Sequence, residues 1–394
     1  MIEDLAIKSD SRILLLVLDG VGGVPVNGKT ELETAYTPNM DKLAKQGITG
    51  LTDPISRGIT PGSGPAHLSL FGYDPIKYLI GRGVLEALGV GLSLSSKDIA
   101  ARGNFATIDA REIVTDRRAG RISTETNKKI CAHLQQNISQ IEDIKIEIAP
   151  GKEHRFVLVL RGNGLSDQIL ETDPQKTGVE PIECRALVPE AQKTARIIKL
   201  FVEQVRELLE LPANMVLLRG FAKPPKISGM EERFKLNPVA IATYPMYRGL
   251  AKLVGMKVLK TGTDIKDEIE TLKSNWEQYD FFYVHIKKTD SFGEDGNFKE
   301  KVRIIEEVDK YIPELLLLNP DVFVITGDHS TPSVLKAHSW HPNPFLLCSK
   351  WVIPDQAGRF TERECSLGGL GRFNAIHSVP LMLAYALKLK KFGA

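Results

Sequence analysis

Three aspartates follow short apolar runs at widely separated places in the chain. These are Asp19 after residues 13–18, Asp290 after residues 281–286, and Asp328 after residues 322–326. Short apolar runs bounded by polar turns are typical of buried strands, and ligand sites in open α/β sheets lie beyond the carboxyl ends of strands. Carboxylates that converge at such a place repel one another unless cations neutralise them. We therefore expect a metal site there.

Two histidines and a fourth carboxylate extend this set. His329 directly follows Asp328, and His338 comes nine positions later, which offers oxygen and nitrogen donors that a loop can fold around a divalent ion. Glu294 stands four residues after Asp290, within reach of the same ion across a turn. The alternatives are that Asp328 caps a turn beside surface histidines, and that Glu294 belongs to an acidic solvated loop.

Ser63 lies between two glycines in Thr60-Pro-Gly-Ser63-Gly-Pro-Ala-His67, before a segment with helical character. This position leaves its hydroxyl sterically open near a helix N-terminus. A serine hydroxyl is a weak nucleophile at neutral pH, and coordination to a metal is one way to activate it. The alternative is a tight loop in which Ser63 caps the helix. For His67, a satisfied helix histidine is favoured over a group that faces the site.

The segments around these residues alternate between strand and helix. Residues 13–18 predict a strand, and a helix over residues 37–46 follows with Pro38 in its first turn. Near the other end, a helical pattern over residues 298–318 separates the two later strands. Such strand-helix-strand units favour a parallel sheet, so the first and last thirds are expected to form one domain.

The middle of the chain has a different pattern, with a short strand over residues 156–160 and a long amphipathic helix over residues 191–211. We expect it to be an insertion. The predicted division gives one discontinuous domain of residues 1–75 and 236–394, which binds the metals, and an inserted domain of residues 76–235.

Composition narrows the class of protein. The 394 residues are 42% hydrophobic and carry 51 basic and 49 acidic side chains, so no large field of one sign favours nucleic acid as a partner. The four cysteines form no CxxC pair, which argues against a disulfide framework and fits a cytoplasmic location. No apolar run is long enough for a membrane span, so we expect no membrane partner. Oligomeric state is not predicted.

Several motifs together resemble the archaeal-type cofactor-independent phosphoglycerate mutases, a family of the alkaline phosphatase superfamily. Besides the segments around Asp19 and Ser63, they are Thr37-Pro-Asn-Met-Asp-Lys-Leu, Ala66-His-Leu-Ser-Leu-Phe-Gly-Tyr-Asp-Pro, Gly81-Arg-Gly-Val-Leu-Glu-Ala-Leu-Gly, Asp116-Arg-Arg-Ala-Gly-Arg121 and Gly327-Asp-His-Ser-Thr-Pro. The resemblance covers nearly the whole chain in the right order. It implies an α/β fold with an alkaline-phosphatase-like, mainly parallel sheet flanked by helices, and an inserted α+β domain.

The resemblance also implies a mechanism. Ser63 would take the phosphoryl group from 3-phosphoglycerate and return it to the neighbouring hydroxyl, without 2,3-bisphosphoglycerate, as a step of glycolysis and gluconeogenesis. The family carries two divalent ions, with manganese favoured over magnesium, cobalt or zinc. By similarity, Asp19, Ser63, Asp328 and His329 match one metal site.

The second metal site matches Asp290 and His338, while His341 ranks behind His338 as a ligand. Glu294 stands where the family has a histidine, and a carboxylate there would favour a harder ion such as manganese or magnesium. Gly64 replaces an acidic residue found in many relatives, which leaves proton handling beside the nucleophile open.

Phosphoglycerate carries a carboxylate and a phosphate, and the planar fork of arginine binds both kinds of group. The basic residues of the insertion are therefore expected to hold the substrate, namely Arg117, Arg118, Arg121, Arg155, Arg161, Arg219 and Lys223. For any one of them, a solvated surface charge is the alternative. Asp116 is a candidate general acid or base for the glycerate hydroxyls, or else a salt-bridge partner of Arg118 or Arg121.

Other activities would share most of these residues. One alternative is a metal-dependent phosphatase or another phosphomutase of the same superfamily. A second is a non-catalytic binding protein on the same scaffold, for which Glu294 and Gly64 would be the signs of lost activity. The retained serine and ligands favour the mutase.

Overall fold

The computed structural model describes residues 2–393, which divide into two compact units. The discontinuous unit joins the residues up to Leu79 with those from Ile227 onward, and the inserted unit is Ile80–Lys226. The expected boundaries at residues 75 and 235 therefore shift by four and nine residues. The segment after residue 226 returns to the discontinuous unit because Phe234 is buried there and the Tyr73 hydroxyl donates to the Ser228 carbonyl at 2.7 Å.

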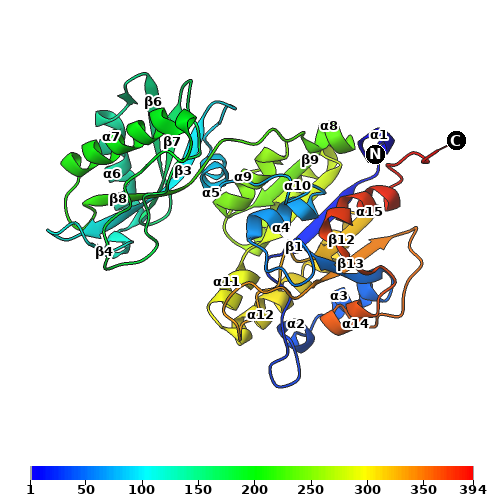
Figure 1. Cartoon of the computed structure of the whole chain (residues 1–394). Coiled ribbons are helices and arrows are strands. Elements are labelled where there is room, and N and C mark those ends of the chain that lie inside the picture. The colour runs from blue at the N-terminus through cyan, green and yellow to red at the C-terminus, as the bar shows by residue number, and fades with distance from the viewer. Residues whose placement is uncertain (1, 394) are drawn as a thin grey trace. The chain divides into compact units, whose positions relative to one another are not determined.

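The discontinuous unit is built on an eight-stranded sheet (Figure 1). In spatial order its strands are β10 (Lys257–Val258), β9 (Pro238–Ala242), β11 (Phe281–Ile286), β1 (Ile13–Leu18), β12 (Val322–Thr326), β13 (Asn343–Ser349), β2 (Ile48–Asp53) and β14 (Gly371–Asn374). Neighbouring strands are parallel except that β13 runs antiparallel to both β12 and β2. The sheet is thus mainly parallel, as the sequence predicts.

Helices cover both faces of this sheet. They are α1 (Ile2–Leu5), α2 (Glu31–Thr34), α3 (Pro38–Ala44), α4 (Ser63–Leu70), α8 (Met230–Phe234), α9 (Pro245–Leu253), α10 (Ile265–Asn275), α11 (Lys288–Glu294), α12 (Phe298–Asp309), α13 (Ile312–Leu317), α14 (Glu362–Ser366) and α15 (Ser378–Tyr385). The single helix expected over residues 298–318 is in fact α12 followed by α13. The first helix does not continue into the second because Pro313, in the first turn of α13, has no backbone N–H to donate.

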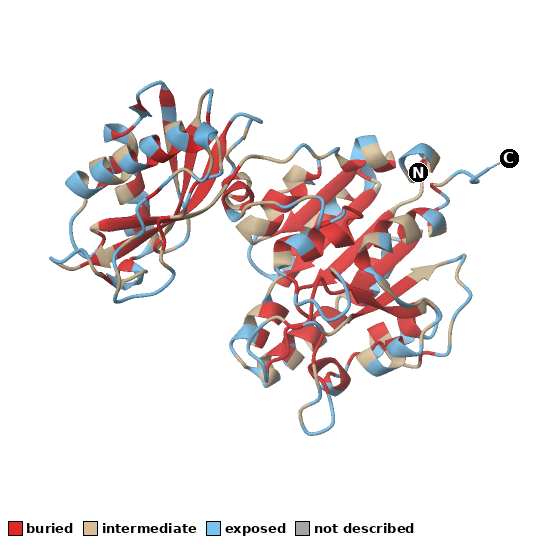
Figure 2. Ribbon diagram, in the orientation of Figure 1, coloured by how far each residue is buried: buried red, intermediate tan, exposed pale blue. Residues whose placement is uncertain are grey.

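The core explains why the strands form where they do. Every residue of β1 is buried (Figure 2). Its even-numbered leucines belong to one cluster with apolar side chains of α3, α10 and α12. A strand covered on both faces needs a continuous apolar run rather than an alternating one, and this is what residues 13–18 supply.

The position of β1 brings separate parts of the chain together. It pairs in parallel with β11 on one side and with β12 on the other, with Leu18 opposite Ile286 and Val17 opposite Thr326. The carboxyl ends of these three strands therefore lie side by side. The residues that follow each strand must meet at one edge of the sheet.

The inserted unit is an α+β domain with an antiparallel six-stranded sheet. Its strands are β3 (Ile99–Ile108), β4 (Val114–Asp116), β5 (Gln140–Ile141), β6 (Ile144–Pro150), β7 (Arg155–Arg161) and β8 (Met215–Ala222), and its helices are α5 (Arg82–Gly89), α6 (Thr124–Asn137) and α7 (Gln192–Leu208). Helix α7 ends three residues before the expected limit because Leu209 is already extended. None of the described helices is long and apolar enough to span a bilayer.

Candidate metal centre and nucleophile

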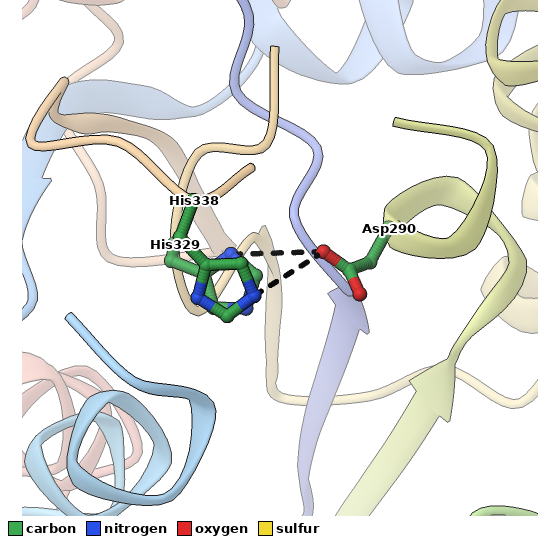
Figure 3. Close-up of side chains that lie close together, drawn as sticks. All are labelled: Asp290, His329 and His338. Carbon is green, nitrogen blue, oxygen red and sulfur yellow. Dashed lines mark ion pairs between the residues drawn. The ribbon is translucent and has the colours of Figure 1, made fainter. Parts of the chain in front are cut away.

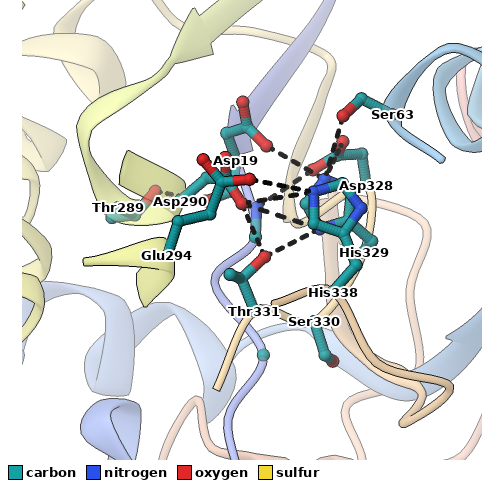
Figure 4. A network of polar contacts seen from close by, with 12 residues as sticks. Asp19, Ser63, Thr289, Asp290, Glu294, Asp328, His329, Ser330, Thr331 and His338 are labelled. Atoms are coloured by element: carbon teal, nitrogen blue, oxygen red, sulfur yellow. Dashed lines mark hydrogen bonds and ion pairs between the residues drawn. The ribbon is translucent and has the colours of Figure 1, made fainter. Parts of the chain in front are cut away.

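The first group of candidate ligands comes from the ends of β1 and β12. Asp19, Asp328 and His329 are all buried, and one ligand atom from each lies within 4.8 Å of the others (Figure 4). The Nε2 atom of His329 is 3.3 Å from Oδ1 of Asp19 and 3.1 Å from Oδ2 of Asp328. The three side chains that the sequence assigned to one site are thus brought together.

The donor atoms of this group fit a divalent cation. Both carboxylate oxygens of Asp19 and Oδ2 of Asp328 are buried and accept no well-aligned hydrogen bond. Burial and the neighbouring Asp19 raise the pKa of Asp328 to about 6, because two carboxylates share a space from which water is excluded. Buried carboxylate oxygens without donors are costly unless a cation satisfies them, so these atoms are suited to metal binding.

The second group consists of Asp290, His329 and His338 (Figure 3). Asp290 lies in the first turn of α11, and its Oδ1 is 3.7 Å from Nε2 of His338. Glu294, one turn later on α11, has its Oε1 3.9 Å from the same nitrogen, although its side chain is half exposed and lies outside the group. His341 belongs to neither group, and its Nδ1 lies 3.0 Å from Oγ of Ser339.

Hydrogen bonds fix which nitrogen of each histidine is free. The hydroxyl of Thr331 donates to Asp290 at 2.6 Å and therefore accepts from Nδ1–H of His329 at 3.0 Å. The Nδ1–H of His338 donates to the Pro61 carbonyl at 2.9 Å. In both rings the lone pair is left on Nε2, the atom that faces the carboxylates, as in histidines that bind metals.

Lys287 and His285 are two neighbours of the site that the sequence analysis did not identify. The ammonium of Lys287 lies 3.1 Å from Oδ2 of Asp19 and also contacts Asp290. Burial opposes ionisation of Asp19, but Lys287, His285 and His329 together outweigh it and hold the pKa of this carboxyl well below its usual range. His285 Nε2 is 3.2 Å from Asp19, and burial lowers the pKa of His285 to about 4. The sequence signal for His285 was its position inside the apolar run of residues 281–286.

Ser63 is the first residue of α4 and its Oγ is 3.4 Å from Nε2 of His329. The helix N-terminus offers free N–H groups and a partial positive charge to an anion at this hydroxyl. One turn later, Nδ1 of His67 lies 3.0 Å from the Ser63 carbonyl and 3.1 Å from Oδ2 of Asp328. His67 therefore faces the site after all, as a partner of the ligand Asp328.

The inserted unit carries a basic surface on one face of its sheet. On β3, Arg102 is opposite Arg219 of β8, and Asn104 is opposite Arg155 of β7, which places all four on the same face. The Nε atoms of the three arginines have no hydrogen-bond partner. Burial, with the nearby arginines, lowers the pKa of Arg102 to about 10, although Glu86 opposes this. Such a concentration of positive charge suits an anion, and Arg102 was not identified from sequence.

Three of the predicted arginines have acidic partners within the inserted unit, and one of them, Arg219, lies 3.9 Å from Asp173. Arg117 forms a two-pronged ion pair with the buried Asp173. Arg161 pairs with both Asp98 and Glu147. Since these guanidinium groups already bind carboxylates, contact with a substrate would require them to leave or share those partners.

The carboxylate of Asp116 accepts the backbone N–H groups of Arg118 and Gly120, each at 2.7 Å. It thus bonds to the backbone of the turn, whereas the predicted salt bridge would join it to an arginine side chain. Arg118 and Arg121 are exposed on this turn. Lys223 is half-buried beyond β8, and its backbone N–H donates to Asp167 at 3.1 Å.

The fold and the site define a class of α/β proteins in which carboxylate and histidine side chains, here candidate ligands for divalent metal ions, gather at the carboxyl ends of a mainly parallel sheet. The family model described as 2,3-bisphosphoglycerate-independent phosphoglycerate mutase matches residues 44–214. A protein of Aquifex aeolicus is 55% identical, with 100% of both chains covered, and one of Thermus thermophilus is 51% identical over 100% of this chain and 99% of its own. Both are named "Probable 2,3-bisphosphoglycerate-independent phosphoglycerate mutase". The chain belongs to this family.

Two solved structures are similar over almost the whole chain. A protein of Pyrococcus horikoshii superposes with a TM-score of 0.84 at 33% identity, covering 98% of this chain and 100% of its own. The cofactor-independent phosphoglycerate mutase of Thermoplasma acidophilum superposes with a TM-score of 0.76 at 30% identity, covering 95% of this chain and 100% of its own. The architecture of both units is therefore that of the family.

Proposed function

We propose that this chain is an isomerase that interconverts 3-phosphoglycerate and 2-phosphoglycerate without added 2,3-bisphosphoglycerate. Membership of the family, at 55% identity over the full length of a relative, supports the reaction. The observation that carries the mechanism is the position of Ser63 at the start of α4, with its hydroxyl 3.4 Å from His329 and beside buried carboxylates. Such a hydroxyl is placed to accept a phosphoryl group and to return it.

In the proposed first half-reaction, Oγ of Ser63 loses its proton and forms a bond to phosphorus. The bond between phosphorus and the 3-oxygen of the substrate breaks, and that oxygen takes up a proton. In the second half-reaction, the 2-hydroxyl of glycerate loses its proton and attacks phosphorus, the bond between phosphorus and Oγ of Ser63 breaks, and Oγ takes up a proton. The N-terminus of α4 stabilises the negative charge on the phosphoryl oxygens in both steps.

Two divalent cations are part of this proposal. The residues that would hold them are Asp19, Asp328 and His329 with Ser63 for one, and Asp290 and His338 with Glu294 for the other. When bound, such ions lower the pKa of a coordinated hydroxyl and neutralise phosphoryl oxygens. The hydrogen bonds of Thr331 and Pro61 support these roles because they leave Nε2 of both histidines free. Manganese stays the predicted metal.

The basic face of the inserted unit is proposed to bind the carboxylate and phosphate of the substrate. Arg155 and Arg219 are retained from the sequence prediction, and Arg102 is added because it is buried among other arginines. Arg118 and Arg121 remain candidates on the adjoining turn. Asp116 is proposed to shape that turn, and a role as general acid or base stays a prediction. The cytoplasmic location and the place in glycolysis and gluconeogenesis are also predictions.

An assay with purified protein, 3-phosphoglycerate and Mn²⁺ tests the proposal. We expect 2-phosphoglycerate to form without 2,3-bisphosphoglycerate, to stop forming after treatment with a chelator, and to form again when Mn²⁺ is added. Release of inorganic phosphate in place of 2-phosphoglycerate would support a phosphatase. Absence of any turnover with each divalent metal would favour the non-catalytic alternative.

A further inference from the structure

A lysine is completely buried directly behind the candidate metal ligands. Lys301 lies on the buried face of α12 in line with Ile304, Ile305 and Val308, and its exposed fraction is 0%. A lysine is almost never fully buried unless its charge is compensated, because removing an ammonium from water is costly. The partners of Lys301 therefore indicate why the chain tolerates it there.

The ammonium of Lys301 donates to three backbone carbonyls. They belong to Gly20 at 2.9 Å, Gly22 at 3.1 Å and Thr331 at 2.8 Å. Gly20 and Gly22 lie in the loop that begins with Asp19, and Thr331 lies two residues after His329. A single side chain from α12 thus joins the two loops that carry the first group of ligands.

The same two loops are also joined directly. The backbone N–H of Thr331 lies 3.2 Å from the Gly20 carbonyl and 3.1 Å from the Gly22 carbonyl, so both carbonyls are shared with Lys301. The N–H of Gly20 in turn donates to Asp328 at 3.0 Å. The distance between the Asp19 loop and the Asp328 loop therefore depends on contacts that Lys301 completes.

The third strand end is connected through Thr331. Its hydroxyl forms hydrogen bonds with Asp290 and with His329. A shift of the Thr331 backbone would therefore disturb candidate ligands of both groups. The backbone carbonyl of Thr331, to which Lys301 donates, also lies 2.4 Å from where a Cβ at Gly293 would stand, so α11 passes close against it. There is little room for this loop to move toward α11.

We propose that Lys301 is a positioning residue that sets the spacing of the metal ligands through the backbone of their loops. Among the described residues, its side-chain hydrogen bonds go to backbone carbonyls, those of Gly20, Gly22 and Thr331. Its ammonium serves as a fixed internal cation inside a cage of carbonyl oxygens, so that the carboxylates are already close together when divalent ions arrive. The inference rests on the metal sites of the proposed function.

In the first test, metal-free Lys301→Ala is titrated with Mn²⁺ in a calorimeter. A thermal unfolding curve of the same variant shows whether it is folded. We expect the affinity for Mn²⁺ to fall by roughly 10- to 100-fold, as when outer partners of metal ligands are removed. The matched control is Lys299→Ala, an exposed lysine on the same helix, which should bind Mn²⁺ like the parent protein.

Chemical rescue separates positioning from a general loss of structure. Deleting the side chain leaves a cavity lined by three carbonyls that a small cation can enter. Ammonium chloride should therefore restore much of the lost Mn²⁺ affinity to Lys301→Ala, whereas tetramethylammonium chloride, which has no N–H donor, should not. A folded Lys301→Ala that binds Mn²⁺ as tightly as the parent would overturn the proposal, as would equal rescue by both salts.

If Lys301→Ala does not fold, Lys301→Gln takes its place in the same titration. Its amide is neutral and shorter, so it cannot reach all three carbonyls, and we again expect weaker Mn²⁺ binding. Parent-like affinity in a folded Lys301→Gln would contradict the proposal. If the parent protein itself binds no Mn²⁺, the proposed function fails instead, and the two failures are distinguishable.

Discussion

The residues of the site owe their chemistry to neighbours that fix them. The Thr331 hydroxyl accepts a hydrogen bond from Nδ1–H of His329, and the Pro61 carbonyl accepts one from Nδ1–H of His338. These bonds decide which nitrogen of each ring carries the proton. The remaining lone pairs face Asp19, Asp328 and Asp290. This arrangement pre-orients ligands before any ion binds, and it decreases the reorganisation that binding would otherwise need.

Ser63→Ala tests the nucleophile. Removal of the hydroxyl should lower kcat by roughly a thousandfold or more, because the proposed covalent step loses its acceptor. The melting temperature should stay close to that of the parent, since only one half-buried oxygen is lost. Ser69→Ala, the same change in the same helix, is the matched control. Substantial mutase activity in Ser63→Ala would exclude the proposed mechanism.

Thr331→Val tests the bridging hydroxyl. The variant keeps the shape of the side chain but removes the bonds to Asp290 and His329, so we expect Mn²⁺ affinity to fall by roughly 10- to 100-fold in a metal titration. Thr326→Val is the matched control, because its buried hydroxyl donates to the Pro344 carbonyl instead. If the Mn²⁺ affinity falls equally in both variants, the hydroxyl of Thr331 does not position the metal ligands.

The sequence indicated the candidate ligands more readily than the residues that contact them. Asp19, Asp290 and Asp328 could be selected because each follows a recognisable strand, and strand ends gather at one edge of a sheet. Lys287, Thr331 and Lys301 could not be selected, because their roles depend on contacts between loops that are distant in the sequence. The spacing of residues in the sequence does not indicate which backbone carbonyl a buried lysine will contact.

At the scale of elements, the order of strands around β1 decides the site. The runs 13–18, 281–286 and 322–326 were predicted as strands and form β1, β11 and β12 with the same limits. Their apolar residues are continuous because both faces are covered. Helix limits were less predictable: the break between α12 and α13 depends on Pro313, which also fits the first turn of a helix.

The basic face of β3, β7 and β8 makes a prediction about substrate binding. Arg102→Met should raise KM for 3-phosphoglycerate by about tenfold or more, since a hydrogen bond to a charged group contributes about 1.5–3 kcal/mol. Arg161→Met is the comparison and should change KM less, because Arg161 pairs with two carboxylates, those of Asp98 and Glu147. Among the described residues, Arg102 forms an ion pair with Glu86, at 3.2 Å. A larger change of KM in Arg161→Met than in Arg102→Met would reverse this assignment.

Helix α10 carries a carboxyl group whose titration should be visible in stability. Burial raises the pKa of Glu268 from 4.5 to about 8. Between these two values the unfolded chain has lost this proton while the folded protein keeps it. The contribution of Glu268 to the free energy of unfolding therefore falls as pH rises through this window, by at most about 1.4 kcal/mol per pH unit.

Glu268→Gln removes this dependence because its amide is neutral at every pH. Denaturant unfolding at pH 5 and pH 8 should show that the variant gains stability relative to the parent as pH rises. Glu270→Gln, on the exposed side of the same helix, should show no such trend. A difference between Glu268→Gln and the parent that does not vary with pH would show that Glu268 is ionised in the folded protein.

At the scale of the whole molecule, the ligands come from both ends of the chain because an inserted unit separates them in sequence. The insertion could be predicted from a change of pattern, but its limits could not be placed to the residue. The polypeptide crosses between units at residues 79–80 and 226–227. The insertion was predicted to extend to residue 235, but Phe234 is buried in the discontinuous unit.

The most direct test of the central claim is to look for the phosphoryl group on Ser63 during turnover. The Mn²⁺-loaded protein is mixed with 3-phosphoglycerate, quenched in acid within one turnover, and digested for mass spectrometry. We predict phosphate on the peptide that contains Ser63, and 2-phosphoglycerate without a matching release of inorganic phosphate. Steady formation of 2-phosphoglycerate with no phosphate on Ser63 at any quench time would contradict the account.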